Sequence, residues 1–338
     1  MAVLCVTLCP LRLLLVSMDR RNKIAKIALV PTTRKQKVQK KKTGRAPAVR
    51  ILRAPFFTKF PWLLHGFSTR LGGVSKIYGG SALNLGFTAH DTKAAVERNR
   101  REFISALTAP AEHKSPSSTG QPPLVTLRQI HSDLIQRIAE IPQSNAPLAG
   151  DGMVTDVPEI LLGILAADCL PVIIADPKRR AIGVFHAGWR GTAKRIVEKG
   201  VGEMHRWFGS ESRDLKAAIG PGIRGCCYAV GPEVQSTFEA QFSYGSELFH
   251  ETKEQNEIHE KYPLLFLTAR APGHSELPKK IFLDLAEANR RQLIAAGVLS
   301  KNISDLGLCT HCRQDMFFSH RREKGVTGRM MAAVGVRA

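Results

Sequence analysis

The sequence predicts a layered α/β fold, and three observations lead to this prediction. The chain has 338 residues, of which 43% are hydrophobic, so it can bury one large core or two modest ones. Residues 160–167 and 171–175 are continuously apolar, which is typical of strands that are covered on both faces. A further strand at 181–186 leads through a glycine-flanked turn into a helical pattern at 192–208.

The ordered part of the chain is expected to begin near Arg50, where runs of lysine and arginine give way to mixed apolar segments. Asp91 or Thr92 can cap a helix whose apolar positions have a rough helical spacing, namely Ala95, Phe103, Ile104 and Leu107. Proline, serine and glycine at 110–123 predict a loop after this helix, and a strand is expected at 124–131.

The second half of the chain continues the alternation of strands and helices. Apolar residues form one stripe along the helix predicted at 192–208, consisting of Ala193, Ile196, Val197, Val201, Met204 and Phe208. A strand at 215–219 and a polar insertion at 245–261 follow. A helix at 285–296 is closed by Gly297, and a final strand covers 329–336.

The net charge of +20 is concentrated at the N-terminus, where residues 1–53 hold 14 lysines and arginines against one acid, Asp19. No aromatic residue interleaves the lysines at 40–42, which argues against a dedicated nucleic-acid-binding arm. We therefore expect residues 1–49 to be a basic, disordered extension and residues 50–338 to form a single catalytic domain.

The apolar stretch at 3–16 contains Pro10 and Arg12 and is too short to cross a bilayer, so we expect no membrane span. A signal peptide, an organellar transit peptide and a misassigned start, with Met18 opening a shorter chain, all stay open. The seven cysteines do not form the framework of a disulfide-rich secreted domain. They favour a reducing compartment, and we expect a cytoplasmic location.

Three candidate metal ligands fall near the ends of predicted strands: His131, Cys169 and His186. Neighbouring strand ends can converge on one point, and a thiolate with two imidazoles suits zinc. Three protein ligands would leave a fourth position open, as catalytic zinc requires. The residue types alone also allow three separate structural side chains.

The turn His186-Ala-Gly-Trp-Arg-Gly191 suggests an anion site. Its glycines allow a ligand to approach the backbone, and the following helix start offers unpaired N–H groups. Arg190 can add a bidentate contact to phosphate, whereas Trp189 can stack on a base or simply fill the core.

Other motifs lack the context that their chemistry needs. Gly220-Pro-Gly222-Ile-Arg-Gly225 fits a dinucleotide-binding pattern, but the residues after it indicate a strand or turn where a helix should open. His274-Ser-Glu276 with Cys309-Thr-His-Cys312 is similar to zinc nucleobase deaminases, yet the proline before CxxC is missing. Without a second cysteine pair the same CxxC is an incomplete zinc site, so we expect buried, inert thiols there.

A set of segments in the order of the chain resembles the YfiH family, also called the laccase-domain family. The segments cover residues 50–338 and are His65-Gly-Phe-Ser-Thr-Arg70, Asn84-Leu-Gly86, Gln129-Ile-His131, Asp151-Gly-Met-Val-Thr-Asp156, Ala167-Asp-Cys169-Leu-Pro171, His186-Ala-Gly-Trp-Arg-Gly191, Cys226-Cys-Tyr228, Phe317-Phe-Ser-His-Arg-Arg322 and Gly328-Arg-Met330. Departures from the family pattern at Gly222, Ala229 and His320 concern the pocket near Arg321 and Arg329.

The resemblance implies a layered α/β sandwich of mixed β-sheets flanked by helices, similar also to cysteine-hydrolase-like toxins. It assigns zinc to His131, Cys169 and His186. It implies a purine nucleoside phosphorylase that acts on adenosine, inosine and methylthioadenosine and also deaminates adenosine. The family's older description as polyphenol oxidases and a role in editing peptidoglycan precursors remain alternatives, because a fold alone does not decide chemistry.

For phosphorolysis the enzyme needs donors that hold phosphate while the purine leaves. We expect Arg70, Asn84, Arg190 and Gly191 to bind substrate and Cys169, His186 and Arg190 to act in catalysis. The expected partners are purine nucleosides and phosphate, with no specific nucleic acid and no membrane.

Other readings differ in how they use the same residues. Cys169 could be a nucleophile activated by His186 without metal, which would give a hydrolase or deamidase. Zinc could be purely structural in a binding module, although three ligands argue against this. Copper is less expected than zinc, because one Cys/His site lacks the further ligands of a multicopper electron relay.

Overall fold

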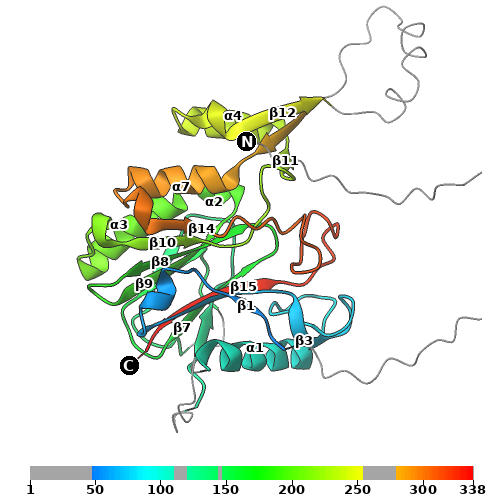
Figure 1. The fold of residues 1–338 in the computed structure, drawn as a ribbon, viewed down its shortest axis with the longest axis vertical. Coiled ribbons are helices and arrows are strands. Elements are labelled where there is room, and N and C mark those ends of the chain that lie inside the picture. Colours follow the sequence, from blue (N-terminus) through cyan, green and yellow to red (C-terminus); the bar gives the residue numbers. More distant parts are fainter. Residues whose placement is uncertain (1–47, 110–119, 144–146, 254–278, 338) are drawn as a thin grey trace, which may run out of the picture. The chain divides into compact units, whose positions relative to one another are not determined.

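The computed structural model describes residues 48–109, 120–143, 147–253 and 279–337 (Figure 1). These residues belong to one compact unit that spans Arg45–Ala338. Most of the predicted extension at 1–49, most of the predicted loop at 110–123 and residues 254–261 of the predicted insertion lie outside the described residues.

Two large mixed sheets form the centre of this unit. The first sheet has the strand order β1 (Ile51–Leu52), β2 (Leu63–Ser68), β15 (Met330–Val336), β7 (Leu161–Ala166) and β4 (Leu124–Thr126). The second has the order β14 (Ile303–Asp305), β10 (Lys216–Ile219), β8 (Leu170–Asp176), β9 (Ala181–Ala187), β6 (Gly152–Thr155) and β5 (Ile135–Arg137). Neighbours are antiparallel except for the pairs β4 with β7, β10 with β14 and β5 with β6.

A smaller antiparallel sheet has the order β11 (Ala229–Val230), β13 (Lys279–Leu283) and β12 (Phe249–Lys253). The predicted polar insertion therefore starts with a 3-10 turn, η3 (Gly245–Leu248), and with strand β12. A short strand β3 (Leu71–Ser75) bridges to Ala82. Three further 3-10 turns are η1 (Phe57–Lys59), η2 (Ser212–Asp214) and η4 (Ser300–Asn302).

The helices are α1 (Lys93–Thr108), α2 (Trp189–Ala193), α3 (Ile196–Phe208), α4 (Pro232–Gln241) and α7 (Leu285–Ala295). The predicted cap of α1 is confirmed, because the Thr92 side chain accepts a hydrogen bond from the backbone N–H of Ala95. Asp284 caps α7 in the same way, and Gly297 follows that helix with a φ of +92°.

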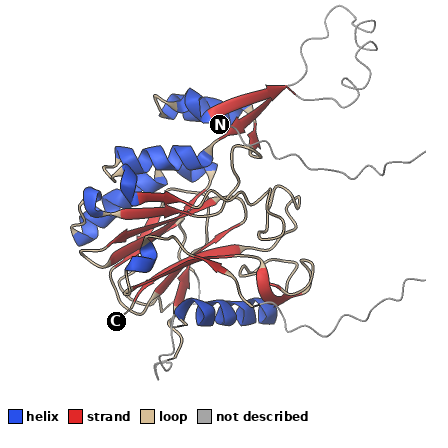
Figure 2. Ribbon diagram, in the orientation of Figure 1, coloured by secondary structure: helices blue, strands red, loops and turns tan. Residues whose placement is uncertain are grey.

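The elements stack in four layers, with α3 and α7 on the outer face of the six-stranded sheet and α1 on the outer face of the five-stranded sheet (Figure 2). Successive residues of β8 alternate between two apolar clusters, since Val172 and Ile174 face the helices whereas Ile173 and Ala175 face the other sheet. The predicted strand covered on both faces is confirmed by this alternation. The layered sandwich of mixed sheets with flanking helices is confirmed with it.

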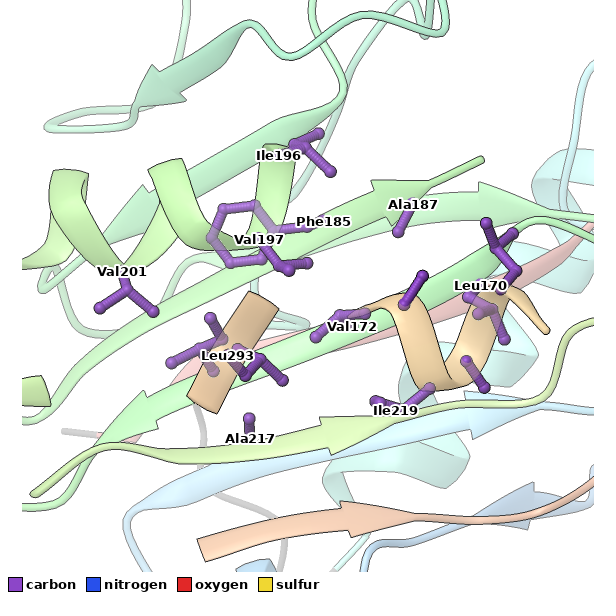
Figure 3. Packing of buried hydrophobic residues seen from close by; sticks show 14 of the residues in the cluster. Leu170, Val172, Phe185, Ala187, Ile196, Val197, Val201, Ala217, Ile219 and Leu293 are labelled. Atoms are coloured by element: carbon purple, nitrogen blue, oxygen red, sulfur yellow. The ribbon is translucent and has the colours of Figure 1, made fainter. Parts of the chain in front are cut away.

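The cluster between the six-stranded sheet and the helices holds the strands that carry the candidate ligands (Figure 3). Phe185 of β9 is fully buried there, and burying such a side chain contributes about 2 kcal/mol. Gly200 lets α3 lie directly on its ring, because a Cβ at that position would be 2.5 Å from Phe185. The packing fixes β9 and hence the position of His186.

Two predicted elements are shorter than expected. The single helix expected at 192–208 is wrong, because Arg195 has a φ of +64° and separates α2 from α3. Both helices bury apolar residues in one cluster, so the apolar stripe continues across the break. The strand expected at 124–131 ends at Thr126, and the chain turns at His131, whose φ is +56°.

Candidate active site

A pocket of about 640 Å³ brings the three predicted ligands together. His131 lies in the loop after β4, Cys169 directly precedes β8, and His186 lies in β9 opposite Pro171 of β8. Their ligand atoms all lie within 4.8 Å of one another. The pocket therefore contains one thiol and two imidazoles that face a common point.

Asp151 holds the loop that carries His131. Its buried carboxylate accepts hydrogen bonds from the backbone N–H groups of Ile130 (3.2 Å), His131 (3.0 Å) and Ser132 (2.6 Å). Three successive N–H groups directed at one carboxylate make the positive φ of His131 favourable despite its backbone cost. Gln129 ties the same loop to β7, since its side chain bonds both the N–H and the carbonyl of Leu165 at 2.8 Å.

The same carboxylate fixes the ring of His186, whose Nδ1 lies 2.8 Å from an Asp151 oxygen. Burial opposes the charged form of this imidazole, but the Cys169 thiolate and Asp151 outweigh burial and raise the pKa of His186 to about 9. Burial likewise opposes the charge on Asp151, yet hydrogen bonds from His186 and Ser132 lower its pKa to about 2. Nδ1 of His186 is thus engaged, which leaves Nε2 to face the pocket.

Cys169 is prepared to act as a thiolate. Burial alone would raise the pKa of its thiol, but His186 and His131 lower it to about 6. The preceding residue, Asp168, has a φ of +96° and is held on three sides. Its carboxylate accepts from the Thr310 hydroxyl (2.7 Å) and the Arg321 N–H (2.7 Å), and its carbonyl accepts from the Ile223 N–H (2.7 Å).

The donor set and the space around it fit a zinc ion. One thiolate with two imidazoles is a ligand set that zinc accepts. Gly188 borders this space, because a Cβ there would lie 2.9 Å from the Cys169 sulfur and 3.4 Å from Cδ2 of His131. The backbone at Gly188 thus leaves room that any side chain would take up.

The structure places Arg190 and Gly191 beside the pocket, on α2. Arg190 is exposed and lies over the ring of Trp189, with 4.5 Å between its guanidinium carbon and the ring centre. Burial and the charge of Cys169 raise the pKa of Tyr228, whereas Arg321 and Arg190 oppose this rise. Arg190 does not itself line the pocket. Gly191 is buried against the Ser132 carbonyl and does not line the pocket.

Arg70 lies apart from the three ligands, in a second cavity of about 550 Å³. Its guanidinium pairs with Glu323 (3.1 Å), donates to the Tyr78 carbonyl (2.7 Å) and lies over Phe318.

Asn84 is fully buried and supports the pocket indirectly. Its side-chain oxygen accepts from the backbone N–H groups of Arg329 (2.9 Å) and Gly86 (3.1 Å). Both of these residues line the pocket, so Asn84 sets the backbone at its edge.

Two cationic residues line the pocket directly, Arg321 and Arg329. Arg321 donates to the Ala229 carbonyl (2.6 Å), and Arg329 donates to the carbonyls of Thr327 (3.0 Å) and Gly328 (3.1 Å). Within the described ranges neither guanidinium pairs with a carboxylate, so both keep their positive charge available to an anion.

Asp151 and Asp168 are functional residues to which sequence reasoning gave no role. Each is an aspartate inside a recognisable motif, but its role depends on partners about 20 to 150 residues away, such as Ser132 and Thr310. The adjacency of Asp168 to Cys169 was the available signal. Contacts across such distances do not show in a local pattern.

The expectation of buried thiols at the CxxC motif is confirmed for Cys309 and wrong for Cys312. Cys309 is buried and Cys312 is exposed, and both meet Cys226 and Cys227 in one group whose sulfurs lie within 4.8 Å of one another. We call these four residues the four-cysteine cluster. The second pair was missed because it is adjacent in sequence and more than 80 residues away.

Among the described residues, every helix is too short or too polar to cross a membrane.

The comparisons with known proteins show the family of this chain. Residues 64–337 match the family described as multi-copper polyphenol oxidoreductase laccase. The purine nucleoside phosphorylase YlmD of Bacillus subtilis is 32% identical over 283 residues, which cover 81% of this chain and 89% of that protein. The adenosine deaminase RL5, from an unknown prokaryotic organism, is 35% identical over 219 residues, which cover 62% and 74%.

A solved structure extends the agreement to the fold. The crystal structure of the hypothetical protein YfiH from Bacillus licheniformis has a TM-score of 0.69 and 30% sequence identity, and it covers 86% of this chain and 97% of that one. The chain therefore belongs to the laccase-like family that includes the YfiH and YlmD proteins.

Proposed function

We propose that this protein is a zinc-dependent purine nucleoside phosphorylase that acts on adenosine, inosine and methylthioadenosine and also deaminates adenosine. The observation that carries the proposal is the convergence of His131, Cys169 and His186 in a pocket that also holds two unpaired guanidinium groups. Relatives named as purine nucleoside phosphorylase and adenosine deaminase support the choice of substrate. The catalytic domain would span residues 50–338.

His131, Cys169 and His186 would hold the zinc ion, with Asp151 orienting His186 and the loop of His131. A zinc ion in this open site would supply Lewis acidity, which serves both phosphorolysis and deamination. The low pKa of Cys169 supplies the thiolate form that a metal requires, whereas His186, whose pKa is raised to about 9, would release its Nε2 proton when the metal binds.

Arg321 and Arg329 would bind phosphate. Both line the pocket and their charges are not neutralised by a described carboxylate. Arg190 and Gly191 remain proposed contributors, but α2 is only five residues long, so its N-terminus adds a weak field. The arginines thus supply most of the positive charge for phosphate.

Phosphorolysis then follows from positioning. A phosphate oxygen forms a bond to C1′ of the ribose, the C1′–N9 bond breaks, and its electron pair leaves with the purine, which takes up a proton. Tyr228 and Phe87 line the pocket, with the guanidinium groups of Arg321 and Arg100 over their rings, so the opposite ring faces would contact the base. Held in this way, phosphate and nucleoside meet at the effective concentration that such a displacement needs.

A second candidate is favoured by one observation, the array of Cys169, His186 and Asp151. A thiolate, an imidazole and a carboxylate in this order form the arrangement of a cysteine hydrolase, with Cys169 as nucleophile. This reading predicts turnover without metal.

The test is turnover of adenosine and inosine by protein of known zinc content, with and without phosphate. The proposal expects phosphate-dependent release of the purine base and phosphate-independent conversion of adenosine to inosine. Absence of both reactions in zinc-loaded protein would overturn it. Replacement of Arg329 by Ala should raise the KM for phosphate, and Arg101→Ala, on the exposed face of α1, is the matched control.

A further inference from the structure

The four-cysteine cluster lies outside the candidate active site and has no part in the proposed reaction. Cys226 and Cys227 follow β10 in a turn where the N–H groups of Cys227 and Tyr228 both bond the Arg224 carbonyl at 2.8 Å. Cys309 and Cys312 lie in the loop after β14. Two of the cysteines are exposed, so burial alone does not explain why the four gather.

The segment that precedes Cys226 and the segment that carries Cys309 are joined by backbone hydrogen bonds that involve no sulfur atom. Gly222 and Cys309 form a parallel bridge, in which the Thr310 N–H bonds the Gly222 carbonyl (3.0 Å) and the Gly222 N–H bonds the Leu308 carbonyl (3.3 Å). The segments are thus held together independently of the thiols. This leaves the four sulfurs preorganised around one point.

The sulfur separations match a metal site better than a disulfide. The sulfur of Cys312 lies 3.7 Å from that of Cys226 and 3.3 Å from that of Cys227. A zinc ion with bonds of about 2.3 Å to four thiolates at tetrahedral corners places the sulfurs about 3.8 Å apart. A disulfide would require about 2.0 Å.

We propose that Cys226, Cys227, Cys309 and Cys312 bind a second zinc ion, distinct from the one at His131, Cys169 and His186. Four protein ligands complete a tetrahedron and leave no open position, so this zinc is structural and not catalytic. Its chemistry is the soft, all-thiolate coordination that zinc shares with few other biological cations.

The four-cysteine cluster lies next to residues that shape the active-site pocket. Tyr228 follows Cys227 and lines the pocket, and Thr310 follows Cys309 and holds Asp168 through its hydroxyl at 2.7 Å. Asp168 precedes Cys169. A zinc ion in the cluster therefore braces one wall of the pocket and the residue that places Cys169.

The test counts zinc and maps cysteine reactivity in the full chain, purified under reducing conditions from zinc-supplemented cells. Wild-type protein should release one zinc ion more than the Cys309→Ser/Cys312→Ser variant, whereas Cys169→Ala is the matched control that should keep the cluster's zinc. This comparison separates the two sites, so failure of the active-site proposal leaves this result readable. Substitution by Co²⁺ should give strong thiolate charge-transfer absorption that largely survives in Cys169→Ala and falls in the double variant to the weaker absorption of the single Cys169 thiolate.

A second measurement needs no variant and so does not depend on folding of the substituted chain. Iodoacetamide labelling and mass spectrometry should find the exposed Cys226 and Cys312 protected in the zinc-loaded protein and modified after chelation. Four thiols that react equally before and after chelation would overturn the proposal. Recovery of the four cysteines as disulfides, or an unchanged zinc count in the double variant, would overturn it as well.

Discussion

Asp151 links the two histidines of the active site, although it does not itself face the metal position. One carboxylate accepts the backbone N–H of His131, at 3.0 Å, and contacts the ring of His186 at 2.8 Å. The Asp151 carboxylate also orients the His186 ring and makes it a better metal ligand. Removal of this carboxylate should therefore weaken metal binding more than it weakens the fold.

We predict that Asp151→Asn lowers zinc affinity at the active site by roughly 10- to 100-fold. Asparagine has nearly the same shape but carries no charge and accepts fewer of the N–H groups at 130–132. Zinc titration against a competing chelator measures the affinity. Asp156→Asn, at an exposed position of the next loop, is the control and should have the wild-type value. Equal affinities for both variants would refute the role of Asp151.

His65 gives a pH-dependent prediction. Its Nε2 accepts the Ala54 N–H at 3.1 Å, and the residue is buried in β2. Burial and the charge of Arg53 lower the pKa of His65 to about 4. Between pH 6.5 and 4 the unfolded chain binds a proton that the folded chain excludes, so stability falls as the pH falls through this range, by up to about 3 kcal/mol. Below pH 4 both states are protonated and the loss is complete.

The check is urea unfolding of wild type and His65→Gln from pH 7.5 to 4. Glutamine keeps an acceptor near Nε2 and does not titrate, so the wild type should lose more stability than the variant over this range. His90→Gln, at an exposed position, should follow the wild type. Parallel curves for wild type and His65→Gln would mean that another group causes the acid loss.

The sequence predicted the three candidate ligands by residue type and position, and the structure brings them together. It could not assign Asp151 or Thr310, because an aspartate or a threonine has many structural uses and only the folded chain selects one. The four-cysteine cluster was not predicted, because CxxC alone is an incomplete zinc site and its partners Cys226 and Cys227 are adjacent residues in another loop.

At the scale of elements, the segment from β9 to α3 sets the site. β9 carries His186, and Gly188 caps α2 with extended φ and ψ of −75° and 170° that any residue can adopt. A substitution at Gly188 would therefore cause no backbone strain, and its effect would come only from the volume of the new side chain. The break at Arg195 was not predictable, because the apolar residues on both sides of it pack into one cluster and the apolar stripe is not interrupted.

We predict that Gly188→Ala reduces active-site zinc occupancy and lowers turnover by roughly 10- to 100-fold. The new Cβ would lie only 2.9 Å from the Cys169 sulfur, so the sulfur must move away from its position in the site. Gly202→Ala on the exposed face of α3 is the matched control, with no neighbouring atom within 4 Å of the new Cβ. It should keep full activity and gain about 0.5–1 kcal/mol of stability. The two are compared by zinc content, kcat and thermal unfolding. A Gly188→Ala enzyme with normal zinc and kcat would show that the site has more room than the structure gives it.

At the scale of the whole molecule, the site depends on the stacking of the two large sheets. His131 follows β4 of the five-stranded sheet, whereas Cys169 directly precedes β8 and His186 lies in β9 of the six-stranded sheet. The apolar cluster between the sheets holds these strands at a fixed distance. The fold class could be predicted from the continuous apolar segments. The strand order could not, because strands that are far apart in the sequence pair with each other and this pairing leaves no pattern in the local sequence.

We predict that residues 1–44 of the N-terminal extension are dispensable. The compact unit begins at Arg45, and Val49 already packs beside the core, so a chain that begins at Arg45 should keep the Tm and kcat of the full chain. Thermal unfolding and nucleoside turnover of the two chains provide the comparison. A fall in either quantity would place the extension in the enzyme.

The zinc mechanism is tested by measuring zinc content and phosphate-dependent base release from inosine on the same preparation before and after chelation. We predict that turnover falls with the loss of zinc and returns when zinc is restored. It also predicts that Cys169→Ser lacks one zinc ion and is inactive. Full turnover by metal-free wild type together with an inactive Cys169→Ser would contradict the zinc mechanism and make Cys169 the nucleophile.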